Sequence, residues 1–131
     1  MSDANKQLMR DMFAALSAGD AEGFLGPLAD DVQWTIHGTT KYSGLYDGKA
    51  DAANRLLGVL GGQLDGGLTV VVDDMVADGD WVVGRGRGLS RTTTGSDYAN
   101  EYCWWYRVVD GKVVEIIEYL DTELVNTVLG R

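Results

Sequence analysis

Four consecutive segments in the second half of the chain have the composition and alternation of β-strands, and only short turns separate them. Asp-Gly occurs in two of the three junctions, at Asp78-Gly79 and Asp110-Gly111, and it is a strong signal for a hairpin turn. Antiparallel hairpins are therefore the simplest connection. The predicted strands cover residues 68–77, 81–92, 98–109 and 112–121.

The first half of the chain is mainly helical by its apolar spacing. Helical periodicity runs from about residue 4 to Gly19, resumes after an N-cap at Asp20 in a short helix that Gly26-Pro27 interrupts, and returns over residues 49–60. One early strand is expected at residues 32–37, because apolar and polar residues alternate there. The polar and aromatic residues 38–48 are expected to form a loop.

Helices collected before antiparallel strands predict an α+β fold, with helices on one face of a strongly curved, mostly antiparallel sheet. The 131 residues contain no linker, repeat or low-complexity segment, so we expect one domain over residues 1–131. A sheet bent over the third helix leaves an internal space. Spaces of this kind bind small molecules.

Composition excludes several functional classes. Twenty acidic and eleven basic residues give a net charge of −9, which would repel the phosphates of a nucleic acid. The single cysteine and single histidine provide neither a disulfide nor a Cys/His metal site, and no dinucleotide fingerprint is present, so we expect no metal and no cofactor. Apolar runs are too short for a membrane helix, and no signal-peptide pattern is found, which predicts a cytoplasmic protein.

The segment 82–89 alternates glycine with larger residues. Gly84, Gly86 and Gly88 share one strand face, and Arg85 and Arg87 share the other. The bare face either lies under bulky aromatic side chains or lets the sheet bend, whereas a phosphate loop would need a strand-to-helix junction. The two arginines either form surface ion pairs or face the pocket, where they would hold an anion or orient a carboxylate.

Glu118 is the only polar residue on its face of the last strand, which it shares with Val114, Ile116 and Leu120. A lone carboxyl group on an apolar face is either paired with a cation or has a raised pKa that suits proton transfer. Both interpretations remain open from the sequence.

Asn100, Tyr102 and Trp104 share a face of the preceding strand. They either orient or polarise a substrate oxygen, or simply pack against the helices. Trp34 is a candidate wall of the pocket or plain core. His37 lies at the edge of its strand, and it is a candidate because its ordinary pKa is near neutrality.

The opposite face of the same strand carries Glu101, Cys103, Trp105 and Arg107. A tryptophan among charged residues on an outer sheet face is typical of a protein contact. We therefore expect a homodimer through the outer sheet face.

The order of elements and several local motifs resemble the SnoaL-like, ketosteroid isomerase-related branch of the nuclear transport factor 2-like superfamily. The resemblance covers essentially the whole chain and implies a cone-shaped sheet around a hydrophobic pocket. The motifs that carry it are Ser17-Ala18-Gly19-Asp20, Ala29-Asp30-Asp31-Val32-Gln33-Trp34, Tyr98-Ala99-Asn100-Glu101-Tyr102, Asp110-Gly111-Lys112-Val113 and Glu118-Tyr119-Leu120-Asp121-Thr122.

The resemblance also allows the catalytic positions of known enzymes of the superfamily to be compared with positions of this sequence. Limonene-type epoxide hydrolases are similar at Arg85 and Glu118, but Arg87 stands where they have a second carboxylate. Ketosteroid isomerases have an aspartate base near the position of Thr35. SnoaL-type cyclases have an acid/base carboxylate near the last strand, which Glu118 or Asp121 matches.

These observations lead to one hypothesis and one alternative. The hypothesis is an isomerase, cyclase or hydrolase-type enzyme that applies general acid/base chemistry to a small apolar, cyclic or polyketide-like molecule. Glu118 transfers the proton, Arg85, Arg87 or Asp121 assists, and ligand contacts come from Trp34, His37, Asn100, Tyr102 and Trp104. The alternative is a non-catalytic ligand-binding or dimerisation module, in which Arg87 and Glu118 form an internal ion pair.

Overall fold

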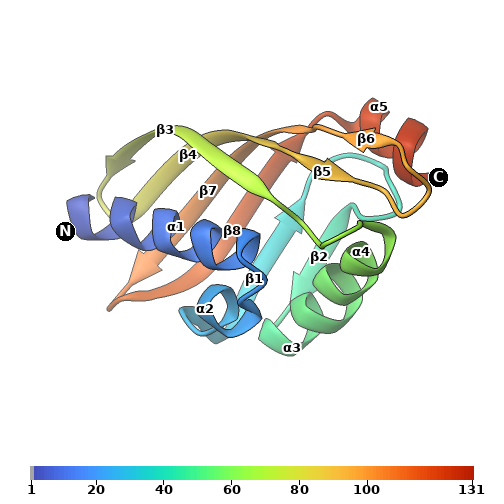
Figure 1. The fold of residues 1–131 in the computed structure, drawn as a ribbon. Coiled ribbons are helices and arrows are strands. Elements are labelled where there is room, and N and C mark those ends of the chain that lie inside the picture. Colours follow the sequence, from blue (N-terminus) through green and yellow to red (C-terminus); the bar gives the residue numbers. More distant parts are fainter. Residues whose placement is uncertain (1) are drawn as a thin grey trace.

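The computed structural model describes residues 2–131, and Met1 lies outside the described residues. Helices occupy three regions of the chain (Figure 1). No helix in residues 2–131 has the length and apolar character needed to cross a membrane. The helical elements are α1 (Ser2–Ser17), α2 (Ala21–Leu25), α3 (Lys49–Asp51), the π-helical segment η1 (Ala52–Leu57), α4 (Gly58–Gln63), α5 (Thr122–Leu124) and the π-helical segment η2 (Val125–Leu129).

Six strands form one sheet in the order β2-β1-β8-β7-β4-β3, and β5 and β6 form a separate two-stranded ribbon. All neighbours in the large sheet are antiparallel except β1 and β8, which are parallel. The strands are β1 (Leu28–Ile36), β2 (Gly44–Asp47), β3 (Val70–Asp78), β4 (Trp81–Gly88), β5 (Ser90–Arg91), β6 (Asp97–Tyr98), β7 (Glu101–Val109) and β8 (Lys112–Leu120).

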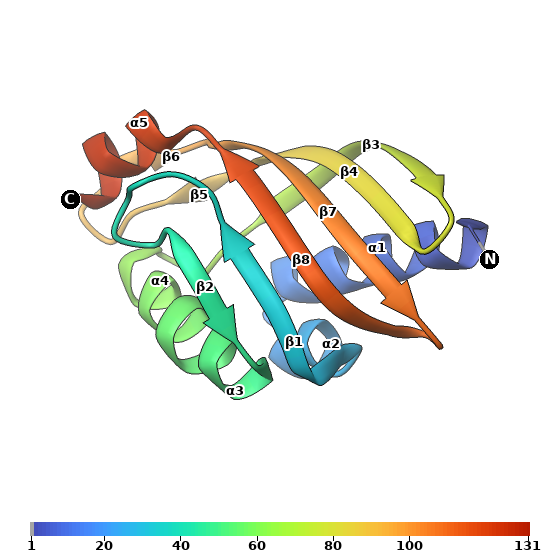
Figure 2. The same ribbon diagram turned by 180° about the vertical axis from the view of Figure 1, so that it is seen from behind.

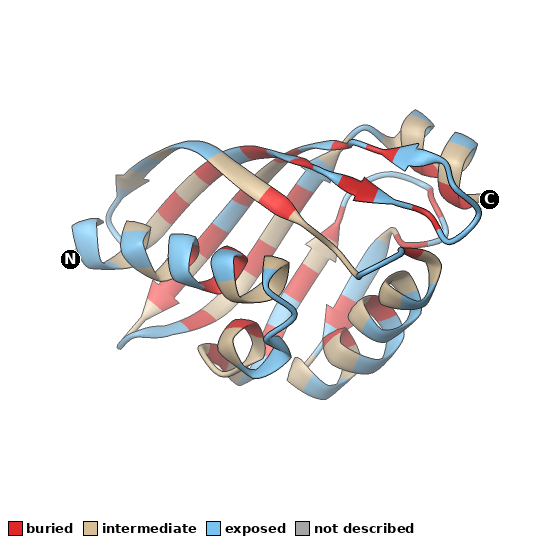
Figure 3. Cartoon of the chain, in the orientation of Figure 1, coloured by how far each residue is buried: buried red, intermediate tan, exposed pale blue. Residues whose placement is uncertain are grey.

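The α+β architecture with helices on one face of a curved sheet is confirmed. α1, α2 and the helical segment from α3 to α4 cover the same face (Figure 1), and the view from behind shows the other face of the strands uncovered (Figure 2). Buried and exposed residues alternate along β4 and β7 (Figure 3), as expected when one sheet face packs on helices. The core therefore lies between the sheet and the helices.

Several boundaries differ from the sequence prediction. Leu28 begins β1 rather than continuing the second helix, because Pro27 cannot extend that helix. The expected loop 38–48 contains β2, which pairs with the end of β1. The predicted strand 81–92 stops at Gly88, where β4 ends, and the chain then forms the separate β5–β6 ribbon.

Of the two interpretations of the glycine face of β4, the one in which bulky side chains cover the glycines is confirmed. The ring of Trp104 lies directly over Gly86, the ring of Tyr102 lies over Gly88, and Met9 of α1 reaches Gly84. The inner face of β4 is therefore the glycine face. Arg85 and Arg87 must then point away from the core.

Candidate functional site

Glu118 of β8 points into the core between the sheet and the helices. The residue is only 6% exposed, and the indole nitrogen of Trp34 donates a hydrogen bond of 3.2 Å to its Oε1 atom. Burial disfavours the charged carboxylate and raises the pKa of Glu118 from 4.5 to about 7, although the Trp34 hydrogen bond acts in the opposite direction. The group therefore changes charge near neutral pH.

An apolar cavity of about 40 Å³ surrounds this carboxyl group. That volume has room for a few water molecules and is far below the size of a typical ligand pocket. Among the described residues, Glu118 is the only charged one in the lining. The lining residues are Phe13, Leu16, Trp34, Ile36, Tyr42, Leu56, Leu57, Leu60, Leu68, Val70, Tyr98, Tyr102, Trp104, Glu118, Leu120 and Val125.

A surface groove of about 290 Å³ adjoins the cavity between the end of α1 and the helical segment of η1 and α4. Leu16, Leu57, Leu60 and Leu68 line both the groove and the cavity. The groove and the cavity therefore lie next to each other and share these four side chains.

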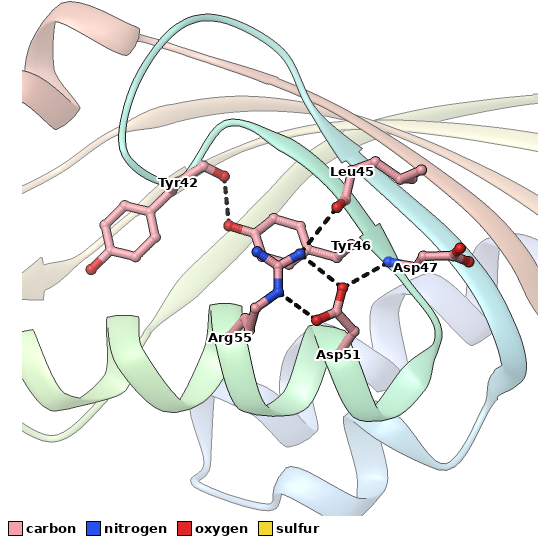
Figure 4. A network of polar contacts seen from close by, with 6 residues as sticks. All are labelled: Tyr42, Leu45, Tyr46, Asp47, Asp51 and Arg55. Atoms are coloured by element: carbon pink, nitrogen blue, oxygen red, sulfur yellow. Dashed lines mark hydrogen bonds and ion pairs between the residues drawn. The ribbon is translucent and has the colours of Figure 1, made fainter.

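A polar network fixes η1, one wall of the cavity, against β2 (Figure 4). The Arg55 guanidinium donates to the Asp51 carboxylate and to the Leu45 carbonyl oxygen, and it lies over the ring of Tyr46. The hydrogen bond from Arg55, together with the one from the Asp47 backbone, lowers the pKa of Asp51 to about 2. Tyr46 in turn donates to the Tyr42 carbonyl oxygen at 2.7 Å, which helps to hold this cavity residue in place.

Asn100 is fully buried, and its side chain is occupied by the protein itself. Its Oδ1 accepts from the backbone N–H groups of Glu101 (2.7 Å) and Asp121 (2.9 Å), and its Nδ2 donates to the Asp121 carbonyl oxygen (3.1 Å). Nδ2 also donates to the Tyr98 hydroxyl at 3.0 Å. Asn100 therefore does not line the cavity but positions Tyr98, which does.

Three buried phenols surround the carboxyl group on the inner face. Burial raises the pKa of Tyr98, Tyr102 and Tyr106, and an ionised Glu118 raises each of them further. These hydroxyls stay protonated at neutral pH. The Tyr106 hydroxyl is buried without a hydrogen-bond partner among the described residues.

The expectation that Arg85 or Arg87 assists Glu118 is wrong. Arg85 pairs with Asp74 at 2.7 Å and Arg87 with Asp73 at 3.3 Å, and all four side chains are exposed. The register shift between Val72 and Asp74 lets the successive aspartates meet both arginines on the outer face. The internal Arg87–Glu118 ion pair that the alternative hypothesis predicted is also absent, because Arg87 pairs with Asp73 on the outer face.

Replacing both arginines with glutamine is expected to leave the Glu118 site unchanged. Exposed ion pairs contribute little to stability, and these two lie on the opposite sheet face from the cavity. We expect the urea midpoint of unfolding to change only slightly in Arg85→Gln/Arg87→Gln. A large drop in the midpoint, or a change in the pKa of Glu118, would place the arginines in the site after all.

Two further candidates also lie outside the cavity. The exposed Asp121 carboxylate caps α5 by accepting from the Leu124 N–H at 3.1 Å. His37 is exposed and stacks on Tyr119, with ring centroids 4.3 Å apart. Within residues 2–131, no cluster of three or more His, Cys, Asp and Glu side chains is arranged to hold a metal ion.

The structure thus brings together Glu118, Trp34, Tyr102 and Trp104, and it adds residues that the sequence did not single out. Phe13 of α1 packs on the Trp104 ring with centroids 4.2 Å apart. Tyr42 comes from the expected loop 38–48, where no strand alternation indicates its direction. Tyr98 begins the predicted strand 98–109 and has the same alternation as Asn100, Tyr102 and Trp104, which is the signal that could have found it.

The curved sheet and the helices together form a cone around an apolar cavity (Figure 1), and Glu118 supplies the carboxyl group in the lining of this cavity. The family model of the SnoaL-like domain matches residues 9–116, and the chain belongs to this family. No curated protein matches the chain by sequence.

Solved structures agree with this fold. An NTF2-like protein from Burkholderia thailandensis E264 is 25% identical, with 98% of each chain covered and a TM-score of 0.84. Another NTF2-like protein, from Burkholderia xenovorans LB400, is 26% identical over 97% of this chain and 96% of that one, with a TM-score of 0.76. A protein from Jannaschia sp. CCS1, assigned as a SnoaL-like polyketide cyclase, shares 18% identity over 98% and 93% of the two chains, with a TM-score of 0.82.

Proposed function

We propose that the protein is an enzyme that moves a proton on a small cyclic or polyketide-like substrate, with Glu118 as the general acid and base. The observation that carries this proposal is a buried carboxyl group, with its pKa raised to about 7, at the wall of an apolar cavity. A proton-transfer group works best when its pKa is close to the working pH. One of the similar solved structures, from Jannaschia sp. CCS1, is named as a SnoaL-like polyketide cyclase, and this name supports the proposal.

The residues around Glu118 suggest how the proton would move. An ionised Glu118 would take a proton from a carbon next to a substrate carbonyl, and the same carboxyl would return it to another atom of the product. Negative charge would develop on the carbonyl oxygen between these steps. The neutral phenols of Tyr98 and Tyr102 are hydrogen-bond donors that can stabilise this charge.

Exchange of the α-protons of cyclopentanone for deuterium tests the proposal without a known substrate. We expect the protein to accelerate exchange in D₂O, followed by NMR, with a rate that rises with pH through about 7 as Glu118 ionises. Glu118→Gln should return the rate to that of buffer alone, while Arg85→Gln should behave as the wild type. Equal exchange in Glu118→Gln and wild type would overturn the proposal.

The small cavity favours a second candidate, a non-catalytic ligand-binding or dimerisation module. The cavity measures only about 40 Å³, because the protein's own aromatic and aliphatic side chains occupy most of the space between the sheet and the helices. This candidate predicts no exchange in the same experiment. Binding of a ligand without any exchange would support it over the enzyme.

We also propose a homodimer through the outer face of the sheet. Trp105 and Tyr119 lie on this face and are 39% and 45% exposed, which is unusual for such large aromatic side chains. Trp105 also contacts Trp81 edge-on, with ring centroids 5.9 Å apart. These side chains give the face an apolar centre among charged residues.

Sedimentation equilibrium tests the dimer. We expect a mass of two chains for the wild type and of one chain for Trp105→Glu, because an unpaired charge would be buried at the centre of the interface. Val59→Glu, at an exposed position of α4 on the helical side, is the matched control and should remain dimeric. A wild-type protein with the mass of one chain at high concentration would contradict the proposal.

A further inference from the structure

Glu118 has no positively charged partner among residues 2–131. It is the one charged side chain among the buried residues of the described chain, and all ion pairs found there join other groups near the surface. Trp34 donates to Oε1 only. When the carboxyl group ionises, its charge is therefore uncompensated, and a ligand could supply the missing positive charge.

The walls of the cavity suit a cation as well. Six aromatic side chains line it: Phe13, Trp34, Tyr42, Tyr98, Tyr102 and Trp104. The faces of such rings attract cations, most strongly where water is excluded. No lysine, arginine or histidine of residues 2–131 lines the cavity, so none of these side chains would repel a cation there.

We propose that the ligand of this cavity is a compact organic cation, a protonated amine on a small apolar body, with its ammonium group against the Glu118 carboxylate. The apolar body would lie among the leucines and aromatic rings. The proposal uses the same cavity as the proposed function but concerns binding, so it does not require catalysis.

Charge distinguishes an organic cation from an anionic ligand and from a neutral ligand. An anion would meet the carboxylate and a chain of net charge −9, with no basic side chain to receive it. A neutral ketone accepts a hydrogen bond only from the protonated carboxyl group, an alcohol can hydrogen-bond to either form, and an ammonium group needs the ionised form. The ketone and the ammonium therefore have opposite pH dependence.

The groups around Glu118 leave this pH dependence simple. Burial raises the pKa of each titratable neighbour, and these neighbours are the phenols of Tyr42, Tyr46, Tyr98, Tyr102 and Tyr106. α1, η1, α4 and η2 present only phenylalanine, leucine and valine to the cavity. Glu118 is thus the group of this site that titrates between pH 6 and 8.

Calorimetric titration with cyclopentylammonium, cyclopentanol and cyclopentanecarboxylate tests the proposal with three probes of one shape. At pH 8 we expect the ammonium to bind about tenfold or more tightly than the alcohol, and the carboxylate to bind weakest. The affinity for cyclopentylammonium should rise about tenfold from pH 6 to pH 8, as the ionised fraction of Glu118 increases. The amine itself stays protonated over this range.

Proton release gives an independent readout on the wild-type protein. At pH 7, about half of the Glu118 side chains carry a proton that the cation must displace, so binding should release about half a proton per ligand. Titrations in two buffers of different ionisation enthalpy measure this number. Proton uptake, or equal affinity for the alcohol and the ammonium at pH 8, would overturn the proposal.

Two variants complete the design. Glu118→Gln should lose the preference for the ammonium, whereas Glu123→Gln, which removes an exposed charge on α5, should keep it. Ammonium binding without cyclopentanone exchange supports this inference and contradicts the proposed enzyme. Exchange without ammonium binding supports the proposed enzyme and contradicts this inference.

Discussion

Glu118→Gln is expected to make the protein more stable than the wild type above neutral pH and to remove a pH dependence from its unfolding. The pKa of Glu118 is raised in the folded protein from 4.5 to about 7. At about 1.4 kcal/mol per pKa unit, keeping the ionised group buried costs roughly 3 kcal/mol. Such a cost is a large part of the stability of a domain of this size.

The sign follows from where each state loses its proton. Above pH 4.5 the unfolded chain releases the Glu118 proton, while the folded protein keeps it up to about pH 7. Stability therefore falls as the pH rises through this window and reaches a constant value above about pH 8. Below pH 4.5 both states hold the proton, and the group has no effect.

Urea unfolding of both proteins between pH 5 and pH 8 measures the effect. The difference in unfolding free energy, Glu118→Gln minus wild type, should grow by about 2 to 3 kcal/mol over this range. Taking the difference cancels the pH dependence of every other group. Glu123→Gln, on the exposed surface of α5, should give a nearly flat difference. A flat line for Glu118→Gln as well would mean that the carboxyl group is not desolvated.

Gly86→Ala is expected to be the most destabilising small substitution in the sheet. A methyl group on Gly86 would lie deep inside contact distance of the Val71 carbonyl oxygen and 2.8 Å from the Trp104 ring. The carbonyl belongs to the backbone of β3, the neighbouring strand, and cannot move without disturbing the sheet. We expect a loss of roughly 3 kcal/mol or more, or failure to fold.

Two other glycines calibrate this result. At Gly84 the added methyl would meet mainly the flexible side chain of Met9, so Gly84→Ala should cost less than Gly86→Ala. At Gly62 of α4 nothing lies within 4 Å, and Gly62→Ala should stabilise the helix by up to about 1 kcal/mol. The midpoint of thermal unfolding should therefore be highest for Gly62→Ala, lower for Gly84→Ala and lowest for Gly86→Ala. Wild-type stability in Gly86→Ala would show that the strand and Trp104 are not packed as described.

Strand alternation predicts much of this site and leaves one ambiguity. It places Glu118 alone on an apolar face and separates the β4 glycines from Arg85 and Arg87. It does not say which face of β4 is the inner one. Trp104 of β7 decides this, since its ring fits only over a strand without side chains. The outward direction of the arginines is therefore a property of the packing between two strands.

Asn100 illustrates a second limit. Its amide, on a strand next to tyrosines, is compatible with a ligand contact, but the structure uses all of it on the backbone of residues 101 and 121 and on Tyr98. Those partners are brought together by the pairing of β7 with β8. The size of the cavity cannot be predicted from the sequence either, because it depends on how Leu57, Leu60 and the aromatic rings fill the cone.

The central claim is that Glu118 is a buried carboxyl group that titrates near neutral pH. Carbon-13 NMR of protein labelled at glutamate side-chain carboxyls, titrated from pH 4 to pH 9, tests it most directly. The resonance missing from Glu118→Gln identifies the group. We predict a midpoint at about pH 7. A midpoint near 4.5, the ordinary pKa of a glutamate, would contradict the desolvated carboxyl on which both the proton-transfer chemistry and the cation-binding cavity depend.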